Sequence, residues 1–210
     1  MTRTLVLVSF ICLFLVSCGA SETPTVSVHS DLDNLKEKAS QVTLSLSELP
    51  VGFVEYRLDS DRMLQEENVL DVQSAFSFQT DSGNLQKIVG MTTIYPYSQR
   101  NPADVSIQMQ SQIELLTRSM VKGFVFTKNV EVRNLVLDKP VGDVYSGKTF
   151  IWSNKDVGFP EYHTRTEILV FERNKITVIL LFQYVDEFPV AISIEAIAHS
   201  LDRQIQDLET

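Results

Sequence analysis

The sequence contains little cysteine, and what it has lies near one end. Its two cysteines, Cys12 and Cys18, fall within the first 18 of 210 residues. A disulfide beyond residue 18 is therefore excluded, and with it the disulfide frameworks that hold small secreted domains together. The rest of the chain must be stabilised by a hydrophobic core, and it is long enough to bury one.

Positive charge is also scarce. The chain has 18 Lys and Arg against 27 Asp and Glu, which gives a formal net charge of −9. Nucleic-acid binding needs concentrated positive charge at the phosphates, and adhesion to anionic lipids needs basic clusters. The composition therefore predicts no nucleic-acid partner and no electrostatic binding to a membrane surface.

The motifs that most often carry enzymatic chemistry are missing as well. The sequence contains no G-x-S-x-G, no G-x-G-x-x-G and no P-loop pattern. Its three histidines, His29, His163 and His199, fall in an expected tether, loop and helix, far apart along the chain. We expect no catalytic residues, no metal, no cofactor and hence no enzyme.

Two pairs of residues are the strongest exceptions. Glu195 and His199 stand four apart on an expected helix and could supply two metal ligands, although an exposed ion pair is the commoner explanation. Glu161 and His163 could pair within a loop, although a solvated loop is commoner. Neither pair is enough to predict a site.

Adjacent carboxylates and the aromatic residues have structural explanations. Glu66–Glu67 and Asp186–Glu187 fall in expected turns or helix starts, where acidic residues typically provide solubility or a cap. The aromatic side chains alternate as sheet residues do and are predicted to lie in the core: Phe76, Phe78, Phe150, Trp152, Phe171 and Phe182.

What the sequence does have is an apolar segment near its beginning. Arg3 precedes Leu5–Val16, which is apolar apart from Ser9 and only 12 residues long. A helix needs roughly 20 apolar residues to cross a bilayer comfortably, so the segment is too short for that. A basic residue, a short apolar core and small residues after it are typical of an export signal.

The residues that close this segment narrow the type of signal. Leu15-Val16-Ser17-Cys18 resembles the bacterial lipobox, in which the cysteine is lipidated and becomes the first residue of the mature chain. The resemblance implies a signal peptide over residues 1–17 and two or three acyl chains on Cys18, which would anchor the protein durably. The alternatives are an ordinary signal peptide with an incidental Cys18, or a short transmembrane anchor. We expect an extracytoplasmic protein held by lipid at the cell membrane or outer membrane.

The following residues are small and polar. We expect residues 18–40 to form the lipidated N-terminus and a flexible tether, with one or two helical turns over Asp31–Ala39. Residues 41–210 are expected to form a single domain.

Strands are predicted where apolar and polar residues alternate between turn residues. The predicted strands are Val42–Leu46, Val72–Gln79, Lys87–Tyr95, Val130–Leu137, Lys148–Ser153, Thr164–Phe171 and Lys175–Val185. A hairpin is expected across Glu172–Asn174. The stretch Ile176–Phe182 is apolar apart from Thr177, which predicts a central strand covered on both faces.

Two long helices are predicted from apolar stripes. The first spans Ala103–Val121, with Val105, Met109, Ile113, Leu116 and Met120 on one face. The second opens at Asp186–Pro189, with Pro189 in its first turn and Gln204 on the polar face. Its stripe comprises Val190, Ile194, Ile197, Leu201, Ile205 and Leu208. Strand runs separated by helices predict an α+β fold with one antiparallel sheet flanked by helices.

Several stretches between Leu44 and Leu208 resemble one protein family. ELPVGF, PVGD before a hairpin, ILVFERNKITVILL and the amphipathic last helix are similar to bacterial lipoproteins with a PsbP/Mog1-like domain. The resemblance implies an α/β/α sandwich without a shared catalytic residue set, and a role in binding partner proteins or assembling membrane complexes.

The leading hypothesis is therefore a monomeric, non-catalytic lipoprotein that binds an envelope protein or helps to assemble an envelope complex. The alternative is a small-ligand-binding lipoprotein, with a pocket between the sheet and the helix over Ala103–Val121. An enzyme is the third hypothesis.

Overall fold

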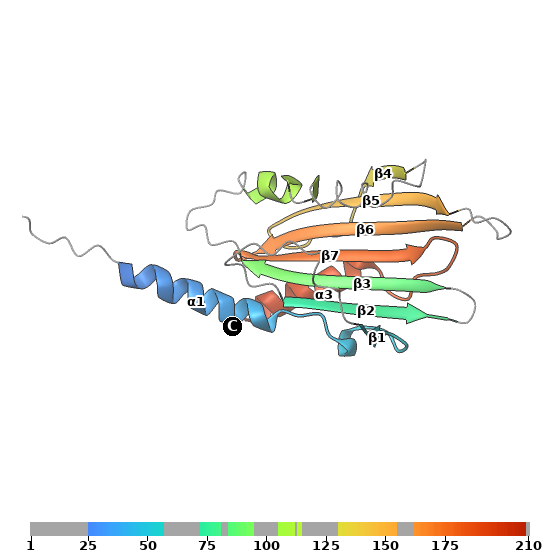
Figure 1. Ribbon diagram of the computed structural model, residues 1–210. Coiled ribbons are helices and arrows are strands. Elements are labelled where there is room, and N and C mark those ends of the chain that lie inside the picture. The colour runs from blue at the N-terminus through green and yellow to red at the C-terminus, as the bar shows by residue number, and fades with distance from the viewer. Residues whose placement is uncertain are drawn as a thin grey trace, which may run out of the picture.

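Seven strands form one antiparallel sheet in the order β1-β2-β3-β7-β6-β5-β4 (Figure 1). The computed structural model describes residues 25–56, 72–80, 84–94, 105–111, 113–114, 130–154 and 162–208. The strands are β1 (Val54–Glu55), β2 (Val72–Gln79), β3 (Leu85–Ile94), β4 (Val130–Asn134), β5 (Val144–Asn154), β6 (Tyr162–Arg173) and β7 (Ile176–Val185). The expected α+β fold with a single antiparallel sheet flanked by helices is confirmed.

The most apolar strand lies at the centre of the sheet, as predicted. Val178 and Leu180 of β7 are fully buried on one face, and Ile179 is buried on the other. Burial on both faces explains why this strand has an almost continuous apolar sequence rather than an alternating one.

The hairpin between β6 and β7 turns slightly later than expected. Glu172 and Arg173 continue β6, and the loop consists of Asn174 and Lys175, with φ of 53° and 67°. Positive φ at both loop residues is the requirement of the two-residue turn that matches the twist of a hairpin.

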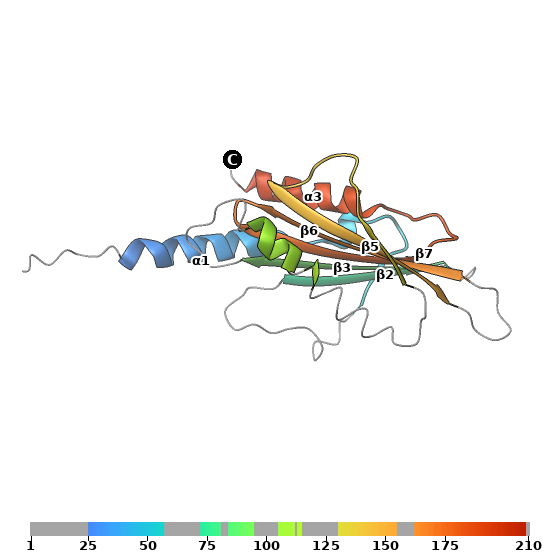
Figure 2. The same ribbon diagram turned by 90° about the horizontal axis from the view of Figure 1, so that it is seen from above.

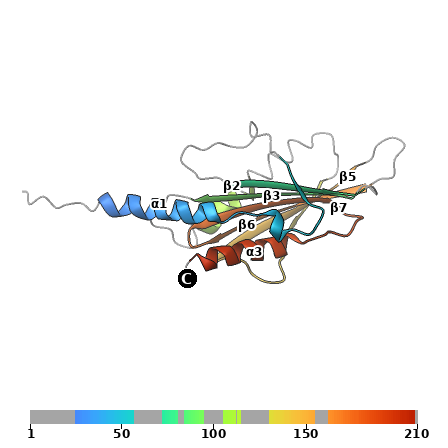
Figure 3. The same cartoon turned by 90° about the horizontal axis from the view of Figure 1, so that it is seen from below.

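Helix α3 (Ile194–Asp207) covers one face of the sheet (Figures 2 and 3). Four residues of the predicted stripe are buried against the sheet: Ile194, Ile197, Leu201 and Ile205. The helix does not begin at Pro189, because Ser193 is its N-cap and accepts a hydrogen bond from the Ala196 N–H. The Pro189 carbonyl instead accepts from the Gln86 side chain, and Val190 is exposed.

The opposite face carries a second helical segment, of which residues 105–111 and 113–114 are described. Val105, Met109 and Ile113 are buried there in one cluster with Phe150 and Trp152. The domain therefore has three layers, helix, sheet and helix. Leu116 and Met120, the rest of the predicted stripe, lie outside the described residues.

Helix α1 (Thr25–Gln41) is longer than the one or two turns expected, so residues 25–30, predicted as tether, are helical. It reaches beyond the end of the sheet (Figure 1), and near its end Leu35 and Ala39 pack on the core. Within the described ranges, no helix has the length and apolar character needed to cross a membrane.

The segment after α1 is not the strand predicted from its alternation. Val42 and Leu44 are buried, but Leu46 is 46% exposed and begins the 3-10 helix η1 (Leu46–Glu48). The Val42 carbonyl accepts a hydrogen bond from the Thr92 hydroxyl of β3 rather than from a backbone N–H of that strand. Side chains thus satisfy this backbone, and the segment lies across the sheet instead of joining it.

The segment after α1 also contacts Gln204 of α3. The Gln204 amide accepts from the Thr43 N–H at 3.2 Å and donates to the Glu48 carboxylate at 2.7 Å. Gln204 was expected on an open polar face, but it links α3 to the segment that follows α1.

Candidate functional site

Helix α3 covers only part of its own face of the sheet. Along β6, Leu169 and Phe171 are fully buried in the core beneath α3. His163, Arg165 and Glu167 share that face, because side chains two apart on a strand point the same way, yet they are partly or fully exposed. The face therefore has a covered half and a polar half. The polar half comprises Glu131, Arg133, His163, Arg165, Glu167, Tyr184, Asp186 and Glu187.

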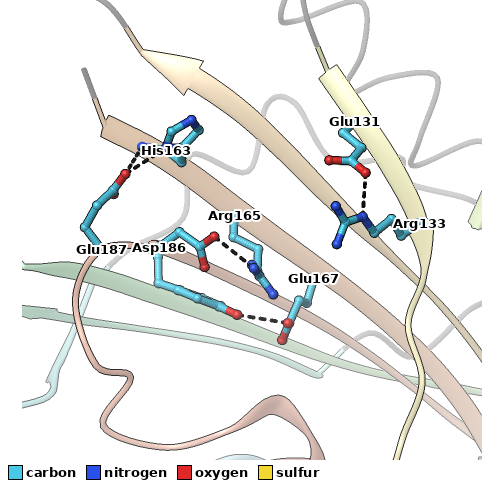
Figure 4. A network of polar contacts seen from close by, with 8 residues as sticks. Glu131, Arg133, His163, Arg165, Glu167, Asp186 and Glu187 are labelled. Carbon is cyan, nitrogen blue, oxygen red and sulfur yellow. Dashed lines mark hydrogen bonds and ion pairs between the residues drawn. The ribbon is translucent and has the colours of Figure 1, made fainter.

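The sheet register aligns this polar half in rows across four strands. One row contains Glu131, Ile151, Arg165 and Tyr184, which are successive partners on β4, β5, β6 and β7. In the neighbouring row, Arg133 is paired through Thr149 of β5 to Glu167. Each row thus carries two opposite charges, one on β4 and one on β6, on the same surface (Figure 4).

Arg165 and Glu167 are at the centre of the polar half. Arg165 Nη2 donates to Asp186 Oδ2 at 2.8 Å, and both side chains are about one-third exposed. The Arg165 guanidinium also lies over the Tyr184 ring, 5.9 Å from its centroid. The Tyr184 hydroxyl donates to Glu167 at 3.0 Å, so the four groups form one connected network.

Partial burial shifts the proton affinities of this network. Burial raises the pKa of Glu167, against the hydrogen bond from Tyr184 and the charge of Arg165. Burial and the Glu167 carboxylate likewise raise the pKa of Tyr184. Burial disfavours the Arg165 cation, but the hydrogen bond to Asp186 and the neighbouring charges outweigh it and leave its pKa raised. The guanidinium is therefore a permanent positive charge at the centre of the surface.

His163 lies at the outer end of this surface, in β6 rather than in a loop as expected. Its backbone N–H donates to Glu187 Oε1 at 2.8 Å, and its ring Nδ1 lies 2.8 Å from the same oxygen. These bonds outweigh the effect of burial and lower the pKa of Glu187. The acidic partner is thus Glu187, while Glu161, the partner considered from the sequence, lies outside the described residues.

At the other end, Glu131 and Arg133 pair on the edge strand β4. Arg133 Nε lies 2.5 Å from Glu131 Oε1, and both side chains are more than half exposed. The hydrogen bond from Arg133 lowers the pKa of Glu131. Because the pair is solvated, it adds little stability and is available to other charges.

His199 and Glu195, considered from the sequence as metal ligands, make contacts that hold the fold together. His199 Nε2 lies 3.6 Å from Glu195 Oε1, as the helical spacing predicted. The same carboxylate accepts from the backbone N–H groups of Asp138 and Lys139, and these bonds lower the pKa of Glu195. Glu195 therefore ties the loop after β4 to α3.

Nowhere in the described ranges do three or more His, Cys, Asp or Glu side chains meet in a way that could hold a metal ion. His29 lies within α1 rather than in a flexible tether. Cys18 and Glu66–Glu67 lie outside the described residues.

Sequence reasoning missed the polar half, although a signal was present. Asp186 and Glu187 were expected to give solubility or a cap, but they accept hydrogen bonds from Arg165 and His163. Polar residues at every second position from 163 to 167, continuous with the buried positions 169 and 171, place charge on the face that forms the core. A solvated outer face would instead put the charges on the opposite side from Leu169.

The arrangement offers several charged groups of both signs on one surface. Paired charges of both signs on a sheet surface can exchange partners with complementary charges of another protein, which favours specificity over affinity. No protein-family model matches this chain, and no curated protein matches it significantly.

Proposed function

We propose that this protein is an exported bacterial lipoprotein whose domain binds a partner protein of the cell envelope or helps to assemble an envelope complex. The lipid on Cys18 would hold it at the cell membrane or outer membrane, and the polar half of the α3 face would contact the partner. The domain acts without a catalytic residue set and without a cofactor.

The observation that carries the proposal is the division of one sheet face. A sheet face that packs against a helix is usually apolar, because its stabilising contribution comes from burying apolar side chains against that helix. Here the uncovered part of the face carries three groups of paired charges on β4, β6, β7 and the loop after β7, in which Arg165 and Asp186 are already about one-third exposed. Charged pairs of this kind fix the orientation of a bound protein and reject like-charged surfaces.

The layered architecture supports a PsbP/Mog1-like domain as part of this proposal. One antiparallel sheet lies between α3 and the helical residues 105–114, as that resemblance implies. The motifs ELPVGF and ILVFERNKITVILL fall on the turn before β1 and on the β6–β7 hairpin. The family's role in partner binding or complex assembly agrees with a recognition surface.

Helix α1 fits a lipid-anchored protein. Its 17 residues rise about 25 Å at 1.5 Å per residue, between the proposed anchor and the domain. It would hold the polar half away from the bilayer surface, where a membrane-bound partner can reach it.

The docking surface is tested by affinity purification from solubilised membranes. Arg165→Glu removes the central cation and places a second acid beside Asp186, so the partner should be lost. Lys87→Glu is the matched control, because Lys87 is an exposed cation of β3 on the other face of the sheet. Equal recovery of the same proteins with both variants would contradict the proposal.

The anchor is tested separately by acyl labelling. Cys18→Ser should abolish the label and leave precursor or release the domain, whereas Cys12→Ser should leave the labelling unchanged. Membrane pelleting of the Cys18→Ser protein with no acyl label would show that the apolar segment itself is the anchor.

A further inference from the structure

Strand β4 is an edge strand of the sheet in the part of the chain that the structure describes. Among the described residues, no strand pairs with β4 on the side away from β5. Its residues 131–134 are all exposed, and Val132 is 46% exposed. An exposed strand edge presents unpaired N–H and C=O groups that can pair with another chain.

The hydrogen-bond pattern identifies which backbone groups are open. The Leu135 N–H donates to the Gly147 carbonyl of β5. Antiparallel strands alternate between hydrogen-bonded and non-hydrogen-bonded pairs, so Arg133 and Glu131 also direct their backbone groups toward β5. Val130, Val132 and Asn134 consequently direct their N–H and C=O groups outward.

We propose that β4 pairs with β4 of a second copy of this chain, antiparallel, about a two-fold axis through Val132. In this register Val132 faces its own counterpart, and Val130 faces Asn134 of the other copy. The outward backbone groups of each copy then meet those of the other. A two-fold contact requires a patch that is complementary to itself, and this strand satisfies that requirement.

The charges follow the same symmetry. Glu131 of each copy lies directly opposite Arg133 of the other, in non-hydrogen-bonded pairs whose side chains approach most closely. The Glu131–Arg133 pair within one strand, at 2.5 Å, becomes a group of four alternating charges. Shifting the axis to Glu131 or to Arg133 would still bring the outward backbone groups together, but it would place like charges opposite each other.

This pairing deepens the proposed function, since it joins the polar halves of two copies. An axis perpendicular to the sheet keeps both α3 helices on the same side. The charged rows that start at Glu131 and Arg133 then continue from one copy into the other. The pairing is a property of the domain itself and does not depend on the anchor at Cys18.

The strength of the contact depends on local concentration. A five-residue strand is a small interface compared with the roughly 800 Å² per partner of a stable complex. We therefore expect the monomer predicted from the sequence in dilute solution. Confinement of both copies to one membrane raises the effective concentration and favours the pair.

Disulfide cross-linking tests the axis. Opposed Cα atoms in a hydrogen-bonded pair lie about 5.5 Å apart, within the range that a disulfide spans. The full chain with Val132→Cys, oxidised both in membranes and after solubilisation at increasing concentration, should give a cross-linked dimer. Val51→Cys is the matched control, a fully exposed valine beside the opposite edge of the sheet, and the parent chain reports any background from Cys12 and Cys18. Cross-linking of Val132→Cys no greater than that of the control would overturn the proposal.

Charge reversal separates pairing from edge protection, since short charged edges also prevent unwanted pairing. In the Val132→Cys background, Glu131→Arg or Arg133→Glu alone opposes like charges across the axis and should abolish the dimer. The double variant restores opposite charges and should restore it. Both side chains are more than half exposed, so the variants should fold, as circular dichroism would verify. Equal cross-linking of single and double variants would show that the register is wrong.

Discussion

The covered and polar halves of the α3 face share strands β6 and β7 but differ in burial and in charge. On β6, Leu169 and Phe171 are fully buried, whereas two positions before Leu169 the same face carries the half-buried Glu167 and then Arg165. On β7 the corresponding change runs from Phe182, buried, to Tyr184, partly exposed. Strands β6 and β7 thus extend beyond α3, and on this face their uncovered ends carry polar and charged side chains instead of buried apolar ones.

Polar contacts differ between the halves as well. In the covered half, Arg173 of β6 pairs with the buried Asp202 of α3, 29 positions later in the chain. Ser200 of α3 donates to Glu48 of η1 at 2.6 Å. These contacts fasten separate elements to one another. In the polar half, the bonds join neighbouring strands and the loop after β7. They order the side chains of this surface and attach no helix to it.

The largest loss of folding stability is expected from a substitution in the core beneath α3. Leu201 is 1% exposed, and Leu201→Asp would place a carboxylate without a partner among apolar side chains. The loss should exceed the 2–5 kcal/mol typical of Leu→Ala at a core site, which is enough to unfold most of a domain whose total stability is about 5–15 kcal/mol. Urea denaturation followed by circular dichroism measures it.

Ala196→Asp is the control, because Ala196 is an exposed residue in the first turn of α3. Negative charge is favourable at a helix N-terminus, so stability should change by less than about 0.5 kcal/mol. Similar denaturation midpoints for the two variants would mean that α3 is not docked through its apolar stripe.

Two arginines on the same strand and face provide the next comparison. Arg173→Ala leaves Asp202, which is 5% exposed, as a buried carboxylate without its cation. Breaking a buried ion pair from one side typically costs about 3–5 kcal/mol. The Gln206 amide remains bonded to Asp202, which places the expected loss near the lower end of that range. Thermal and urea unfolding of the purified protein report it.

Arg165→Ala should be much milder for stability. Arg165 and its partner Asp186 are each about one-third exposed, and pairs of this kind contribute roughly 0–1 kcal/mol. The same unfolding measurement should therefore separate Arg165→Ala from Arg173→Ala by about 2 kcal/mol or more. Equal losses would mean that the polar half stabilises the fold as the covered half does.

The smallest effect is expected from Glu167→Gln, and it depends on pH. Because burial raises the pKa of Glu167, the folded protein holds this proton more tightly than the unfolded chain does. Stability of the parent must then fall as the pH rises from the unfolded pKa through the raised folded pKa. Glutamine keeps an oxygen for the Tyr184 hydroxyl and carries no such proton. The variant should gain relative stability from acid to neutral pH in unfolding series, and a constant difference would contradict the raised pKa.

The sequence predicted correctly those elements in which the spacing of apolar residues matches the positions that are buried. The apolar run of β7 and the stripe Ile194, Ile197, Leu201 and Ile205 follow from the periodicity that burial imposes. The start of α3 was not predictable from Pro189, because proline suits a first turn but Ser193 supplies the cap. The alternation at Val42 and Leu44 predicts a strand, yet contacts with residues distant in the sequence decide otherwise.

The full extent of the polar half was beyond sequence reasoning for a related reason. Glu131 and Arg165 are more than 30 positions apart, and only the register of β4, β5 and β6 brings them into one row. The charges at positions 163 to 167 are in phase with Leu169 and so fall on the core face, but their pattern does not say whether that part of the face is covered or uncovered. Which of the two applies depends on how far α3 extends, and that is a property of the packed domain.

Photo-cross-linking in living cells tests most directly whether the polar half is a docking surface. A photoreactive residue in place of His163 lies on the polar half, away from the edge strand β4, and one in place of Lys87 lies on the other face of the same sheet. The account predicts an adduct with a specific envelope protein from position 163, lost on adding Arg165→Glu and absent from position 87. No adduct at position 163 beyond those formed at position 87 would contradict it.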